Sequence, residues 1–178
     1  MKRWRDGELE RGWRIEDRNR KNNGKTMDRK SKGVYALVIA NSRDISIEIG
    51  HARRVMEFRR GYYAYIGSAL SGLDRRIERH MRDDKKLHWH IDFMLAAQPV
   101  RIVMVFVGRT EERKECEIAA HMSAVMEPVK GFGCSDCSCI SHLFFSPHLN
   151  TLISAVRSSF LAAGVDVSPF SHPSQRTT

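Results

Sequence analysis

The sequence predicts a single domain of mixed α/β character (α+β), in which a small antiparallel sheet of three or more strands is flanked by helices. The chain has 178 residues, of which 42% are hydrophobic, and this length supports one core and little more than one domain. Apolar residues recur at the two-residue period of a strand in the first half of the chain and at the helical period in several later segments. Length and periodicity together therefore favour one mixed domain.

Three strands are expected in the first half of the chain, and a fourth follows later. Val34–Ile39 is apolar and partly β-branched, and turn-forming residues come after it. Isoleucines alternate with polar residues over Ile45–Ile49, the pattern of a half-buried strand. A basic loop at Arg53–Arg60 leads to a strand at Tyr62–Gly67, and Arg101–Val107 has the apolar character of a buried strand. The first three segments fit a small antiparallel sheet.

Helices are expected between and after these strands. In Leu73–Met81, apolar residues fall four apart on one helical face. Leu87–Ala97 and Glu111–Met126 are each followed by a proline, which cannot continue a helix. A last helix begins with Ser146 as its N-cap, has a proline at its first position and stops at Gly164.

The chain divides into four segments. A basic arm covers residues 1–32, the main domain covers 33–145, a helix packed on that domain covers 146–167, and a polar tail covers 168–178. The arm carries 12 Lys and Arg against 6 Asp and Glu, so it supplies +6 of the net charge of +9. This balance points to a polyanionic partner such as nucleic acid, although a solvated arm that binds nothing has the same composition.

Composition also indicates where the protein works. The longest wholly apolar run, Ile102–Val107, is far shorter than the roughly 20 residues that span a bilayer. No apolar stretch follows the charged N-terminus, so secretion is not indicated, and the cysteines are expected to be reduced thiols. We therefore expect a cytoplasmic protein with no membrane partner.

Four short motifs follow one another along the chain. The triplet GVY ends at Tyr35, the triplet YIG begins at Tyr65, an R-x-x-x-H pattern joins Arg76 to His80, and Glu117 opens a later helix. In this order the motifs resemble those of the GIY-YIG nuclease superfamily, with valine in place of the middle isoleucine of the first triplet. The interval between the two triplets is longer than in the compact superfamily pattern.

A closer resemblance covers about residues 33–145. It is to an uncharacterised prokaryotic (archaeal or bacterial) branch of the superfamily. The segments that carry it are GYYAYIGSAL, RRIERHMR, KKLHWHIDFML, ECEIAAHM and GFGCSDCSCISHLFF. The resemblance implies a GIY-YIG-like fold with a site for phosphodiester hydrolysis.

The implied reaction needs a positioned water, a base for its proton and cations on the phosphate. By resemblance, Tyr35 and Tyr65 would lie near the water, and Arg76 would bind the phosphate, for which its planar fork is suited. A free tyrosine titrates at about 10, so its use as a base needs a neighbouring cation. Without the resemblance, aromatic residues at strand ends are expected to pack.

The resemblance also implies one divalent metal ion, Mg²⁺ or Mn²⁺, held by a glutamate. Such hard cations prefer carboxylate oxygen. Glu117 matches the family's acid best because small apolar residues follow it, and Glu115 is the alternative. Two residues so spaced on a helix point in different directions, so only one is expected to be a ligand. Both could instead simply begin an acidic helix.

Histidines near the same helix could join the site. His80 lies four residues after Arg76 on one helical face, so it could orient or deprotonate the water. His88 is a further candidate, because on a helix it would share a face with Asp92, which could fix its tautomer. His90 ranks below it, since a histidine beside tryptophan more often packs than binds.

Basic residues around this helix form a separate group. Their role is either to contact the nucleic-acid backbone or to keep the protein soluble. They are Arg75, Arg79, Arg82, Lys85 and Lys86.

A cysteine-rich segment has the pattern C-x-x-C-x-C-x-x-H, with Cys134, Cys137, Cys139 and His142. Thiolate and imidazole are zinc ligands, and four of them could complete a tetrahedron around Zn²⁺. The spacing is tighter than the usual pair of ligand pairs, so a turned structural loop with free thiols is the competing interpretation. Asp136 could instead supply an oxygen to the active site.

The leading functional hypothesis is a metal-dependent endonuclease that hydrolyses phosphodiester bonds in DNA, in repair or recombination. The sequence contains no base-reading motif that would distinguish a DNA partner from an RNA partner. The first alternative is a non-catalytic nucleic-acid-binding module on a nuclease-like fold, because fold does not fix function. The second is a zinc-stabilised protein-interaction domain built around the cysteine-rich segment.

Overall fold

The computed structural model describes residues 31–50 and 53–170. The predicted basic arm therefore lies outside the described residues except for its last two positions, and so does most of the predicted tail. The predicted fold class is confirmed, because the described residues form one α+β domain in which helices flank an antiparallel sheet. Among these residues, no helix is both long enough and apolar enough to cross a membrane.

Six of the described strands form one antiparallel sheet. In sheet order they are β6 (Glu127–Pro128), β7 (Leu143–Ser146), β4 (Gly61–Ala69), β1 (Gly33–Asn41), β5 (Val100–Arg109) and β8 (Ser168–Pro169). A separate hairpin pairs β2 (Ile45–Ile49) with β3 (Arg54–Phe58). Strand β1 is buried along its whole length, since β4 and β5 pair with its two edges.

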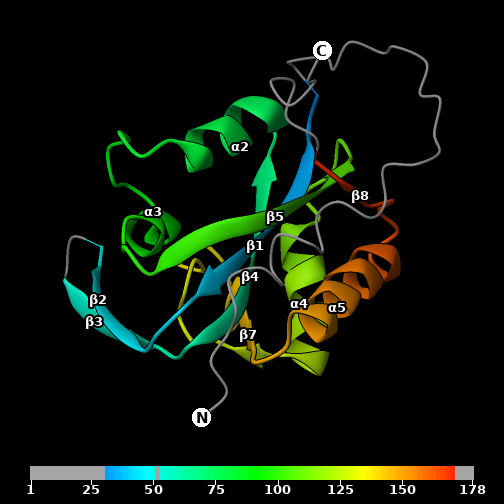
Figure 1. The fold of residues 1–178 in the computed structure, drawn as a ribbon. Helices are drawn as coiled ribbons and strands as arrows, with labels where there is room; N and C mark the ends of the chain where they lie inside the picture. Colours follow the sequence, from blue (N-terminus) through cyan, green and yellow to red (C-terminus); the bar gives the residue numbers. More distant parts are fainter. Residues whose placement is uncertain (1–30, 51–52, 171–178) are drawn as a thin grey trace, which may run out of the picture.

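Helices lie on both faces of the sheet (Figure 1). They are α2 (Leu73–Met81), α3 (His90–Leu95), α4 (Glu115–Val125) and α5 (Leu149–Ala162). One apolar core lies between the sheet, α2, α3 and the β2–β3 hairpin, and it includes Tyr35, Leu73 and Ile91. The other core lies under α4 and α5 and includes Ile118 and Phe160. The two faces follow from the alternation of side chains along β1.

Several expectations about the elements were wrong. The last helix begins at Leu149 with His148 as its N-cap, so Ser146, the expected N-cap, ends β7 instead, and α4 begins at Glu115 rather than Glu111. The basic segment Arg53–Arg60, expected as a loop, contains β3, in which the buried Met56 and Phe58 alternate with exposed residues. The expected helix Leu87–Ala97 is confined to α3, because the Asp92 carboxylate accepts backbone N–H groups just before the helix and fixes its start. The expected tail begins with β8, which pairs with the edge of β5.

Candidate active site and metal-binding cluster

The register of β1 and β4 brings the two motif tyrosines onto one face of the sheet. Tyr35 is paired with Gly67, and Leu37 is paired with Tyr65, so the tyrosines are diagonal neighbours. Their ring centroids are 6.4 Å apart. A Cβ atom on Gly67 would lie 2.5 Å from the Tyr35 hydroxyl oxygen, so this position needs glycine. The long interval between the triplets holds the β2–β3 hairpin and leaves the pairing of β1 with β4 intact.

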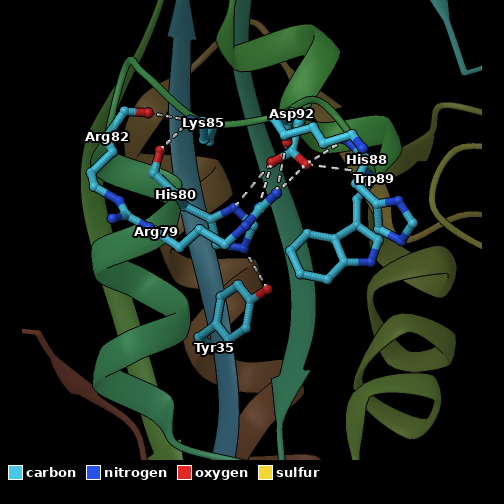
Figure 2. Close-up of polar contacts among 9 residues, drawn as sticks. Tyr35, Arg79, His80, Arg82, Lys85, His88, Trp89 and Asp92 are labelled. Carbon is cyan, nitrogen blue, oxygen red and sulfur yellow. Dashed lines mark hydrogen bonds and ion pairs between the residues drawn. The ribbon is translucent and has the colours of Figure 1, made fainter.

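The Tyr35 hydroxyl is hydrogen-bonded to His80 Nε2 at 2.8 Å (Figure 2). Both side chains are buried, and the burial lowers the pKa of His80 to about 3. The imidazole is therefore neutral at neutral pH. His80 Nδ1 has no hydrogen-bond partner and lies 3.9 Å from Asp92 Oδ1. A proton on Nδ1, toward this carboxylate, leaves Nε2 to accept the Tyr35 O–H.

Burial sets the acidity of both tyrosines. It raises the pKa of Tyr35 well above its usual value and that of Tyr65 to about 12. The positive charge of Arg76 opposes the effect of burial at both hydroxyls. Without a further cation, both tyrosines are therefore protonated at neutral pH.

A buried ion pair joins α2 to the first turn of α3. The Asp92 side chain has no exposed surface, and Arg79 donates to its two oxygens at 2.9 Å each. The backbone N–H groups of His88 and Trp89 donate to Oδ2 at 3.0 Å each (Figure 2). Burial raises the pKa of Asp92, but these hydrogen bonds outweigh it, so the net pKa is lowered. Asp92 is thus held as a carboxylate beside His80.

The predicted nucleic-acid contacts divide into two groups. Arg79 was predicted to contact the backbone of DNA, but its guanidinium is committed to the buried Asp92. Lys85 donates to the carbonyl oxygens of His80 and Arg82 at the end of α2. The residues of the predicted set whose side chains are exposed are Arg75, Arg82 and Lys86.

Trp89 carries two guanidinium groups on its ring. The Cζ atoms of Arg76 and Arg79 lie 4.3 Å and 4.1 Å from the ring centroid. These cation–π contacts position Arg76 on the side of α2 that faces the tyrosines. The sequence prediction gave Trp89 no role. In the structure it is the N-cap residue of α3, three residues before Asp92, which is the spacing of a capping box.

The two glutamates at the start of α4 have different surroundings. Glu117 is exposed and accepts a hydrogen bond from Lys114 at 2.8 Å. Glu115 Oε2 is buried and has no hydrogen-bond partner, and its charge raises the pKa of Tyr65. The charges of Asp92 and Asp136 act on Tyr65 in the same direction, so Glu115, the alternative metal ligand, is one of three carboxylates that act on this tyrosine.

The predicted histidines His88 and His90 lie away from the Tyr35 hydroxyl. His88 has an exposed side chain and contributes its backbone N–H to Asp92. His90 Nδ1 accepts the backbone N–H of Gly133 at 3.0 Å. His90 therefore fastens the cysteine-rich loop to α3, as expected for a packed histidine.

Four potential metal ligands meet where this loop approaches the start of α4. They are Cys116, Cys137, Cys139 and His142, whose ligand atoms all lie within 4.8 Å of one another. The predicted member Cys134 is outside the cluster, and its Sγ is 3.7 Å from the carbonyl oxygen of Ile140. Cys116 replaces it. This group of side chains could hold a metal ion.

Burial also determines the protonation of the cluster. It raises the pKa of Cys116, raises that of Cys139 to about 12 and lowers that of His142. The thiols of Cys116 and Cys139 are therefore protonated and the imidazole is neutral at neutral pH in the absence of a cation. His142 Nε2 lies 3.4 Å from Cys137 Sγ and 3.9 Å from Cys116 Sγ.

One comparison with known proteins identifies a family. The family model described as "Domain of unknown function DUF123" matches residues 34–165. The chain belongs to this family. The segment that matches the DUF123 model contains the motif tyrosines, α2, Asp92 and the whole Cys/His cluster. No curated protein and no solved structure matches the chain.

Sequence reasoning missed two members of these sites. Cys116 lies in α4, well before the cysteine-rich motif, and no local spacing connects it with that motif. Asp92 was considered only as a partner for the His88 ring, whereas it binds backbone N–H groups and Arg79. Its place as the third residue of α3, where an acidic side chain can accept the N–H of the N-cap residue, is the signal that could have revealed its capping role.

Proposed function

We propose that this chain is a metal-dependent endonuclease that hydrolyses phosphodiester bonds in DNA, in repair or recombination in the cytoplasm. One observation carries the proposal. The hydroxyl of Tyr35 is hydrogen-bonded to His80 beside Tyr65, and the charge of Arg76 acts on both tyrosines. Three residues for which the GIY-YIG resemblance implies catalytic roles, Tyr35, Tyr65 and Arg76, therefore meet His80, and the four come from three separate elements.

The residues present fit the chemistry of phosphodiester hydrolysis. Arg76 would bind the phosphate and stabilise the charge that develops on it. His80 accepts a hydrogen bond from Tyr35, so the Tyr35 hydroxyl can give its own proton to His80 Nε2 as its oxygen takes a proton from the attacking water. The neighbouring Asp92 carboxylate favours the protonated imidazole, against the larger effect of burial.

The carboxylate of Glu115 fits a hard divalent cation, Mg²⁺ or Mn²⁺. Its Oε2 is buried and unpartnered, a costly arrangement for a carboxylate that a cation would relieve. A bound cation would supply positive charge to the phosphate and lower the pKa of Tyr65. Glu117 is paired with Lys114, which makes it the weaker candidate.

A cleavage assay with a matched pair of arginine variants tests the proposal. The substrates are supercoiled, single-stranded and branched DNA, together with RNA, each with Mg²⁺ or Mn²⁺ and with EDTA. We expect metal-dependent cutting of DNA that falls by at least about 100-fold in Arg76→Ala, because a donor to the transition state is removed. Arg75→Ala, an exposed neighbour on the same helix, is expected to cut like the parent.

Two results would contradict the proposal in different ways. Equal cutting by Arg76→Ala and the parent would show that the site is assigned to the wrong residues. Binding of DNA by the parent without cutting on every substrate would favour the non-catalytic nucleic-acid-binding module.

A further inference from the structure

We propose that Cys116, Cys137, Cys139 and His142 form a structural zinc site that fastens the start of α4 to the cysteine-rich loop. The four side chains come from two parts of the chain. Cys116 belongs to α4, whereas Cys137, Cys139 and His142 belong to the loop that ends at β7. Their ligand atoms converge to within 4.8 Å of one another. This site is separate from the carboxylate proposed to bind Mg²⁺ or Mn²⁺, and it does not depend on nuclease activity.

The distances suit one tetrahedral ion. With Zn–S bonds of about 2.3 Å and Zn–N bonds of about 2.0 Å, ligand atoms at the corners of a tetrahedron lie about 3.5 to 3.8 Å apart. His142 Nε2 is 3.4 Å from Cys137 Sγ and 3.9 Å from Cys116 Sγ. The ligands are thus close to the required separation, and small side-chain rotations complete the site.

The chemistry of the ligands selects zinc. Three thiols and one imidazole form a Cys₃His set, which is typical of structural zinc sites. Thiolate is a soft ligand and a poor one for Mg²⁺ or Mn²⁺, which prefer oxygen. Four protein ligands also fill the tetrahedron and leave no open position for a substrate, so the role is structural.

The backbone around the cluster is already fixed in place. His142 donates its N–H to the carbonyl oxygen of Phe132 at 2.8 Å, and its own carbonyl oxygen accepts the N–H of Ile66 in β4 at 2.9 Å. His90 holds Gly133 on the other side of the loop. The loop is therefore anchored to β4 and α3, and the zinc site would add its link to α4.

This link has a consequence for the tyrosine site. Glu115 precedes Cys116 in α4, and a Cβ atom on Gly133 would lie 3.1 Å from Tyr65 Cε2. The loop thus packs against the ring of Tyr65. Zinc would hold both the wall of the tyrosine site and the glutamate beside it.

The test measures metal content in the full-length protein and in two matched variants. We expect one zinc ion per chain in the parent and in Cys134→Ser, and a loss of most of the zinc in Cys116→Ser. Cys134 lies in the same loop but outside the cluster, so it controls for the loss of any thiol. Loss of zinc from Cys134→Ser with retention in Cys116→Ser would overturn the assignment. So would a parent that holds iron, or one that takes up no zinc when zinc is supplied.

A measurement on the parent alone guards against misfolding of Cys116→Ser. The native protein is treated with a thiol-alkylating reagent, with and without a strong chelator, and the modified cysteines are mapped by mass spectrometry. We expect Cys134 to react at once and the other three cysteines to react at least ten times more slowly until the chelator is added. Equal reactivity of all four cysteines without chelator would overturn the proposal.

Discussion

At the scale of single residues, burial controls the chemistry of the Tyr35–His80 pair. The imidazole is surrounded by α2, the tyrosines and Trp89, and desolvation disfavours its charged form. His80 is therefore available as a neutral acceptor for the Tyr35 hydroxyl over the whole neutral range. The same burial makes the histidine a source of pH-dependent stability.

The sign of this pH dependence follows from the lowered pKa. Histidine in an unfolded chain titrates at about 6.5, whereas His80 in the fold titrates at about 3. As the pH falls below about 6.5, the unfolded state takes up a proton that the folded state refuses, so the fold loses stability. Between about pH 7 and about pH 5, the free energy of unfolding of the parent is expected to decrease. The decrease in His80→Gln is expected to be smaller by about 2 kcal/mol, because this variant lacks the buried imidazole.

Urea denaturation at the two pH values checks this prediction. The half-buried His90 and the buried His142 also have lowered pKa values, but they contribute equally to both proteins and cancel in the comparison. An identical loss of stability in the parent and in His80→Gln would show that His80 is protonated in the folded chain.

Local sequence spacing could predict only part of the site. Arg76 and His80 are four residues apart, so helical periodicity alone places them on one face. Cys116 could not be found in this way, because its contact with the cysteine-rich loop depends on how α4 packs against the sheet. The preference for Glu115 over Glu117 likewise depends on the direction of side chains on α4, which the sequence left open.

At the scale of elements, the Arg79–Asp92 pair connects α2 with the start of α3. The Asp92 carboxylate satisfies two backbone N–H groups and a guanidinium, so one side chain caps α3 and ties it to α2. The sequence predicted both helices, but α3 was expected to be longer, because its start is set by this tertiary contact. Strand β3 was missed for a similar reason. Exposed charged residues alternate with its buried Met56 and Phe58, and the segment becomes a strand through its pairing with β2 and its packing on the core.

Removal of either partner of this ion pair is expected to destabilise the fold. Asp92→Asn and Arg79→Met should each lower the free energy of unfolding by about 3 to 5 kcal/mol, since each leaves a desolvated group without its partner. Arg75→Met, an exposed position on α2, is expected to change it by less than about 0.5 kcal/mol. Denaturation curves measure all three. Losses for Asp92→Asn and Arg79→Met as small as that for Arg75→Met would show that the pair does not hold α2 to α3.

At the scale of the whole molecule, the sheet separates two cores, and the candidate functional residues lie near β4. The tyrosine site lies on the face covered by α2 and α3, and the Cys/His cluster lies where the start of α4 meets the loop before β7. The composition and periodicity of the sequence predicted this fold class, because alternation in the strands and the helical period survive without tertiary information. The packing of the cysteine-rich loop on Tyr65 and the effect of the Glu115 charge on this tyrosine both depend on segments that are distant in sequence.

The proposed nuclease activity requires that Glu115, whose charge acts on Tyr65, binds the divalent cation. The most direct measurement compares nicking of supercoiled DNA by the parent, Glu115→Gln and Glu117→Gln at the same Mg²⁺ concentration, with zinc content determined for each protein. We predict that Glu115→Gln loses at least about 100-fold of the activity while Glu117→Gln cuts like the parent. Unchanged cutting by Glu115→Gln, or its loss in Glu117→Gln alone, would contradict the claim.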